Sequence, residues 1–307
     1  MSTPTGPASG LPVRMPRPRQ SGRHRRPEPV VAPEGAATLV LAVPGTPSPA
    51  ARSVAEEVIS IARSELPGLN AVIGYLEGDD AEFPALASVL TLCATERVAA
   101  YQQATAAGRE VAVPTGPSAV VVPLLAGPDS ALIRRIRQAV MESGTQVELT
   151  DVLGPHPLLA EALHVRLSEA GLARADRARL FTVATAADGI VLATVGGDEA
   201  VKAAGITGML LAARLAVPVM AAALDVEGSV SSIADQLKNA GSLQLALAPY
   251  LVGPEIDSGL LDAAAKEAGC ATAEPLGAYP AIGKLVLSLY ASALGIKPAA
   301  PQGVAAL

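Results

Sequence analysis

Histidines are few in this sequence, and one of them, like one glutamate, follows a predicted strand. The chain has three histidines, of which His24 lies in an arginine-rich start. His156 lies in a strand-to-helix turn, where its imidazole could donate to a ligand or cap the helix that begins at Pro157. Glu77 follows a strand that ends near Leu76, and strand alternation would point its side chain into a cleft. We therefore take Glu77 and His156 as candidate metal ligands.

A structural role for the histidines is the alternative, and the spacing favours it. His164 lies three residues after Glu161 on one predicted helix, so the two share a face. Di-iron proteins use this spacing in several copies, which this chain lacks. Single ligands rarely hold a metal ion, so the same alternative applies to His156.

Glycine-containing turns are the second kind of candidate site. They follow predicted strands, where unpaired N–H groups at the start of the next helix favour carboxylate or phosphate groups. Glycine and a capping serine also form ordinary strand-to-helix turns, so both roles stay open. The candidate ligand-binding residues are Gly45, Thr46, Ser48, Gly127, Ser130, His156 and Gly196.

Several common chemistries have no motif in this chain. The sequence contains no G-x-S-x-G nucleophile turn, no G-x-x-x-x-G-K-[ST] phosphate loop, no G-x-G-x-x-G after a strand and no H-E-x-x-H. Cys93 and Cys270 stand far apart, which argues against a disulfide framework or a zinc knuckle and predicts a cytoplasmic protein. Hydrolase, nucleotide-binding and dinucleotide-dependent activities therefore lose their usual support.

Charge is distributed unevenly along the 307 residues. The net charge is −6, but the first 36 residues carry six arginines against two glutamates, which leaves −10 on the rest of the chain. Such a body repels polyanions, so nucleic-acid binding is not expected. The start is rich in Pro, Arg, Gly and Ser, which predicts a disordered basic arm that could contact a protein partner. No run is apolar enough to predict a membrane span.

Short β-branched runs alternate with longer helical patterns from Ala37 onward, which predicts an α/β fold with parallel sheets. Predicted strands and helices alternate in the order strand, helix, and each half has four of both. The strands are expected near 38–43, 70–76, 119–124, 146–150, 189–194, 217–223, 243–248 and 270–274. The helices are expected near 48–65, 83–107, 129–143, 157–171, 198–214, 229–241, 256–268 and 280–293.

An internal duplication is the strongest organisational signal. Leu41 to Gly45 matches Leu192 to Gly196, and Pro123-Leu124 matches Pro249-Tyr250. Leu153-Gly154 likewise matches Leu276-Gly277, in the same order along the chain. The first half is longer by about 25 residues, which we place between Cys93 and Pro117. The predicted organisation is an arm at 1–36, α/β halves at 37–174 and 175–294, and a tail at 295–307.

The order of these motifs resembles the sirohydrochlorin chelatase family of class II tetrapyrrole chelatases, in its long form with two halves. The first half carries the resemblance in the strand before Gly45, in Gly74-Tyr-Leu-Glu77, in Val120-Val-Val-Pro-Leu-Leu125 and in Leu153-Gly-Pro-His-Pro-Leu158. It implies two tandem flavodoxin-like domains that face each other across a cleft. It also implies an acidic tetrapyrrole as ligand, with cobalt or ferrous iron as the substrate metal.

The residues that this family uses for metal insertion are mostly replaced. The family places a histidine immediately before the first glycine turn, where this chain has Pro44. A second histidine is expected after the Pro123-Leu-Leu segment, and none occurs before His156. Only the glutamate carries over, as Glu77. The proline side chain offers no hydrogen-bond donor, acceptor or metal ligand. The chain therefore lacks the imidazoles that the family uses for metal insertion.

Three functions follow from this pattern. A degenerate family member would bind a tetrapyrrole or a metal complex without efficient metal insertion. An active cobalt or iron chelatase of cobalamin or siroheme synthesis would instead have to use other groups, such as Glu77, Asp79 or His156. A third alternative is an interaction scaffold with an empty cleft, since a retained fold does not establish a ligand.

Overall fold

The computed structural model describes residues 31–79, 82–173, 187–253 and 255–296. Most of the predicted arm, the predicted boundary at 174 and 175, most of the predicted tail, and Asp80 lie outside these residues. Within them, no helix is long and apolar enough to cross a membrane.

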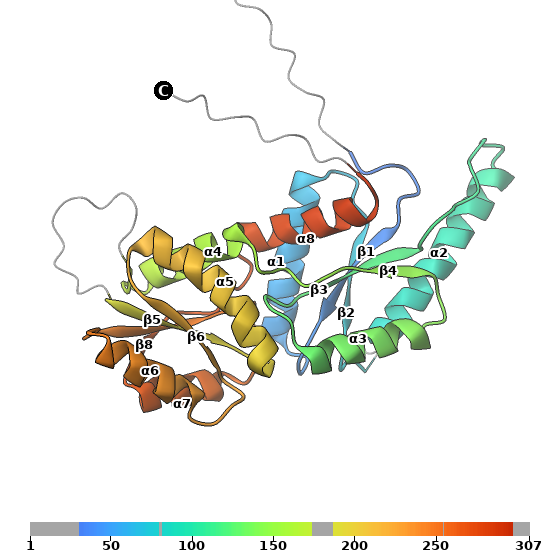
Figure 1. Cartoon of the computed structure of the whole chain (residues 1–307). Helices are drawn as coiled ribbons and strands as arrows, with labels where there is room; N and C mark the ends of the chain where they lie inside the picture. The colour runs from blue at the N-terminus through green and yellow to red at the C-terminus, as the bar shows by residue number, and fades with distance from the viewer. Residues whose placement is uncertain (1–30, 80–81, 174–186, 254, 297–307) are drawn as a thin grey trace, which may run out of the picture.

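Two parallel sheets of four strands follow each other along the chain (Figure 1). The first has the order β2-β1-β3-β4 and the second the equivalent order β6-β5-β7-β8. The first half contains β1 (Thr38–Val43), α1 (Pro49–Glu65), β2 (Ala71–Tyr75), α2 (Leu86–Ala106), β3 (Ala119–Pro123), α3 (Ser130–Glu142), β4 (Val147–Leu149) and α4 (Pro157–Glu169). The second contains β5 (Gly189–Thr194), α5 (Gly197–Leu215), β6 (Val219–Ala223), α6 (Ser229–Asn239), β7 (Leu245–Pro249), α7 (Ser258–Ala268), β8 (Ala271–Thr272) and α8 (Pro280–Ala293).

The duplicated α/β fold predicted from the sequence is confirmed, and each predicted strand and helix is present within a few residues. Part of the extra length of the first half lies in α2, which has 21 residues where its counterpart α6 has 11, and the loops on both sides of α2 are also longer than those around α6. Strand β1 is buried at all six positions because helices cover both faces of the sheet. Its even and odd residues therefore enter different cores.

The two sheets share one central core. Leu39 and Leu41 of β1 belong to the same buried cluster as Ile190 and Leu192 of β5. Helices α1, α4, α5 and α8 contribute to this cluster, whereas α2 with α3 and α6 with α7 cover the outer faces. Because apolar burial is the main favourable term in folding, the shared cluster stabilises the packing of the two halves against each other.

The last helix of each half packs against the other half. Helix α8 lies along α1 and β3 of the first half (Figure 1), and the Tyr290 hydroxyl donates to the Ala37 carbonyl at 2.7 Å. Helix α4 in turn packs on α5 and β7, and Arg166 of α4 donates to the Leu276 carbonyl at 2.9 Å. The halves of the sequence repeat are thus interlocked by an exchange of helices.

Substitution of Gly283, in α8, tests how closely this helix packs against α1. A Cβ atom at Gly283 would lie 2.6 Å from Ile61 Cβ and 3.1 Å from the Val58 carbonyl oxygen, both in α1. We expect Gly283→Ala to lower the free energy of unfolding by about 1–3 kcal/mol through overpacking.

The matched control is Gly205, in the interior of α5, where a Cβ would meet no atom within 4 Å. Gly205→Ala should raise the free energy of unfolding by about 0.5–1 kcal/mol, because alanine has the higher helix propensity. Urea unfolding of both variants measures these changes, and equal effects would contradict the close α1–α8 contact.

Candidate functional site

The carboxyl ends of the two sheets meet, and Tyr250 fills the space between them. Tyr250 follows β7, is fully buried, and accepts a hydrogen bond from Thr207 Oγ1 at 3.1 Å. Burial raises the pKa of Tyr250 to about 12. A Cβ at Gly127 would lie 3.2 Å from the Tyr250 ring, and one at Gly154 would overlap the Tyr250 hydroxyl. Both glycines therefore serve close packing between the halves.

Gly196 completes this contact from the second half. It adopts a left-handed conformation, with φ at 108°, and a Cβ there would lie 2.7 Å from the Pro128 carbonyl oxygen. The Gly196 N–H donates to Asp225 Oδ2 at 3.0 Å. The turns at Gly127 and Gly196, both predicted as ligand sites, thus lie against each other, and their glycines permit this approach.

The turn after β1 has the predicted shape. Pro44 is buried directly after the strand, and Gly45 adopts a φ of 77°. Ser48 caps α1 by accepting from the Ala51 N–H at 3.1 Å, with Pro49 as the first helical residue. Thr46 is the exposed polar side chain of this turn.

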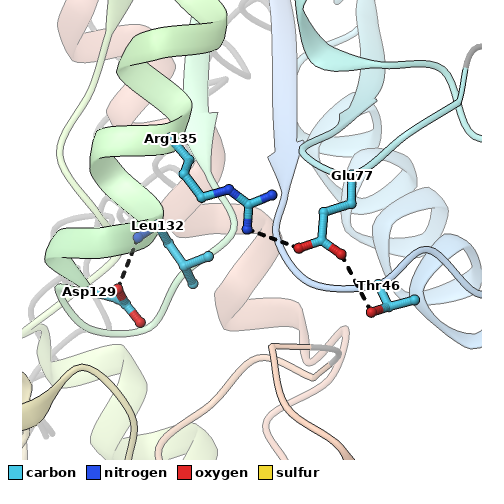
Figure 2. Close-up of polar contacts among 5 residues, drawn as sticks. All are labelled: Thr46, Glu77, Asp129, Leu132 and Arg135. Atoms are coloured by element: carbon cyan, nitrogen blue, oxygen red, sulfur yellow. Dashed lines mark hydrogen bonds and ion pairs between the residues drawn. The ribbon is translucent and has the colours of Figure 1, made fainter.

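Glu77 is held by partners from two other elements (Figure 2). Its Oε1 pairs with Nη1 of Arg135 from α3 at 2.9 Å, and Thr46 Oγ1 donates to Oε2 at 3.5 Å. The side chains of Arg135 and Glu77 are 46% and 36% exposed. Both carboxylate oxygens thus have a donor, and the nearest charge is a guanidinium.

Ser130 and its neighbour Asp129 begin α3. Asp129 is the N-cap, because its Oδ1 accepts from the Ala131 and Leu132 N–H groups at 2.9 Å each, and Ser130 is the first helical residue (Figure 2). The N–H groups that a ligand could use at this helix end are thus partly taken by the chain itself.

The second half has an equivalent of Glu77. Aligning Leu76-Glu77 with Leu224-Asp225 places Asp225 after β6, as Glu77 follows β2. In both halves this acid binds the turn after the central strand, through Thr46 in the first and Gly196 in the second. Arg135 is the partner that distinguishes the first half.

His156 caps α4. Its Nδ1 accepts from the Leu158 N–H at 3.1 Å, which assigns the ring proton to Nε2 in the neutral form. In that tautomer Nε2 is a hydrogen-bond donor and not a metal ligand. Burial lowers the pKa of His156 below its ordinary 6.5. The capping role predicted as one alternative is thus confirmed.

The other metal-ligand candidates have partners within the chain. His164 is buried, and its Nδ1 accepts from Arg214 Nε at 2.8 Å. The backbone N–H of Asp79 donates to the Phe83 carbonyl in the turn after β2. Among the described residues, no three His, Cys, Asp or Glu side chains are grouped so that they could hold a metal ion.

Sequence reasoning missed Arg135, Asp225 and the filling role of Tyr250. Asp225 has a signal in the repeat alignment, because it follows the same leucine as Glu77. Arg135 has none, since it lies 58 residues from Glu77 and only the fold brings the two together.

Two cavities lie away from this meeting edge. One of about 890 Å³ is lined by the start of β1, by α2 and by the loop after α2. The other, of about 620 Å³, lies between α1 and the edge strand β2. Neither is lined by Pro44, Glu77 or Arg135.

Comparison with known proteins supports the fold. No family model and no curated protein matches the sequence. SirB from Bacillus subtilis, solved with Fe³⁺, matches with a TM-score of 0.61 and 13% identity, over 84% of this chain and 95% of SirB. The chain is similar in fold to SirB. At this identity the match to SirB concerns the arrangement of the two parallel sheets.

Weaker matches are ZnuA and a periplasmic ribose ABC transporter from Conexibacter woesei, both with a TM-score of 0.33. They are 10% and 14% identical, each over 85% of this chain, and cover 98% and 86% of their own chains.

The cap at His156 predicts a pH dependence. Its lowered pKa means that the unfolded chain binds this proton more readily, so the contribution of the neutral cap is complete above about pH 6.5 and falls as the pH drops below it. His156→Asn keeps a good cap that does not titrate. As the pH is lowered from about 7.5 to 5.5, we therefore expect its free energy of unfolding to rise relative to that of wild type. His156→Ala should cost about 1 kcal/mol at pH 7.5. Urea unfolding at both pH values measures these free energies. An equal change between the two pH values for wild type and His156→Asn would contradict the predicted pH dependence.

Proposed function

We propose that this protein is a sirohydrochlorin chelatase-like protein that binds an acidic tetrapyrrole, or its metal complex, without efficient metal insertion. The observation that carries the proposal is the pairing of Glu77 with Arg135, beside a buried Pro44. A metal-inserting site needs a group that accepts a pyrrole proton and a ligand for the incoming ion. Glu77 is paired with a guanidinium, and Pro44 has neither function.

The fold supports a ligand of this class. The resemblance of the motifs implies a tetrapyrrole site at the carboxyl ends of the strands, and these ends meet in the structure. SirB, which has the same arrangement of sheets, was solved with Fe³⁺. In this chain Thr46 and Arg135 place hydrogen-bond donors beside Glu77, and such donors suit a ligand with carboxylate groups better than a bare cation.

A spectroscopic titration with sirohydrochlorin, with and without cobalt or ferrous iron, tests the proposal. We expect a saturable shift of the tetrapyrrole absorption and no metallated product at catalytic protein concentrations. Formation of the metallated product would instead assign an active chelatase. Absence of any shift would leave the scaffold function.

Pro44→His tests whether the missing imidazole limits the reaction. The variant should gain measurable cobalt insertion, because imidazole can both accept a proton and ligate the metal. Pro44→Ala is the matched control for loss of the proline ring and should stay inactive. Equal product formation by both variants would contradict the assigned role of this position.

A further inference from the structure

We propose that Arg135 binds a carboxylate group of the ligand and that Glu77 is an internal carboxylate that competes for it. This inference rests on the proposed function and names its ligand class, a planar polycarboxylate. Arg135 would thus be a specificity-determining residue at a position where the sequence offers no family motif.

The geometry leaves room for a second carboxylate. A guanidinium carries five N–H donors, and within the described part of the chain Arg135 makes one hydrogen bond, from Nη1 to Glu77 Oε1 at 2.9 Å. Figure 2 shows the Arg135 side chain crossing from α3 to the loop after β2, with its guanidinium between the two. The side chain is 46% exposed, so the remaining donors can receive a bidentate partner.

The charges around Arg135 make this site selective for anions over free cations. The chain beyond residue 36 carries −10, so an anionic ligand is repelled unless a local cation receives it. A divalent metal ion beside Glu77 would meet the positive charge of Arg135 at close range. The Arg135–Glu77 pair therefore disfavours binding of a free cation. The Arg135 guanidinium instead favours a ligand carboxylate, which can replace Glu77 or bind beside it.

The role of Glu77 follows from the same pair. Its carboxylate occupies one of the donors that a ligand could use and adds a like charge next to an incoming carboxylate. Glu77 thereby lowers the affinity of Arg135 for the carboxylates of a polyanion. The equivalent acid of the second half, Asp225, bonds a backbone N–H instead, so this competition belongs to the first half alone among the described residues.

Binding of two probes to the full chain tests the inference. Uroporphyrin I, a planar tetrapyrrole with eight carboxylates, is followed by absorption, and mellitate, a benzene ring with six carboxylates, by calorimetry. We expect Arg135→Gln to weaken binding of both by about tenfold, as for the loss of a charge-assisted hydrogen bond. Glu77→Gln should tighten binding several-fold, because a competing carboxylate is removed.

Arg137→Gln is the matched control. It removes the same charge from the same helix, but two residues farther on, about 200° around the helix axis. Its affinities should stay within about twofold of wild type. The half-exposed Arg135–Glu77 pair contributes little to folding, so thermal unfolding should shift by less than about 3 °C in Arg135→Gln.

The outcomes separate this inference from the proposed function. Unchanged binding in Arg135→Gln, equal losses in Arg135→Gln and Arg137→Gln, or weaker binding in Glu77→Gln would each overturn the inference. If uroporphyrin fails to bind while mellitate binds in an Arg135-dependent way, the tetrapyrrole function falls and the carboxylate site stands. If uroporphyrin binds wild type and Arg135→Gln equally well, the tetrapyrrole-binding function stands and the inference about Arg135 falls.

Discussion

The shared core between the two sheets is the constraint on which the rest of the structure depends. Helices α1, α4, α5 and α8 fill one apolar layer, and the exchange of α4 and α8 means that the inner face of each sheet is fully covered only with a helix of the other half. Burial of this layer sets the distance between the sheets. The turns at Gly127, Gly154 and Gly196 can then meet Tyr250 and the start of α3, because glycine is small enough for that distance.

At the polar end of this core, the chain uses its own groups to satisfy the positions that could receive a ligand. Ser48, Asp129 and His156 accept from backbone N–H groups at the starts of three helices. Glu77 is met by Arg135 and Asp225 by Gly196. Both acids that follow the second strand of a half therefore have a partner within the chain.

Much of the fold followed from the sequence, because the signals concerned are local or repeated. The buried β-branched runs, the proline and serine at helix starts, and the matched turns of the two halves predicted the strands and helices within a few residues. The parallel sheets followed from the alternation of strands and helices, whereas the flavodoxin-like strand order came with the family resemblance and agrees with the structure. The exchange of α4 and α8 had no such signal, since an apolar helix face does not specify which sheet it covers.

The sequence by itself determined the duplicated α/β architecture, the shape of the turn at Gly45 and the presence of Pro44 at the end of the first strand. These depend on residue type and on short-range backbone preference. Only the tertiary structure decided that Glu77 lies against Arg135 and that Tyr250 fills the meeting edge. These contacts join residues that are far apart in the chain. The packing of helices and sheets brings them together, and the hydrophobic periodicity of the sequence does not specify that packing.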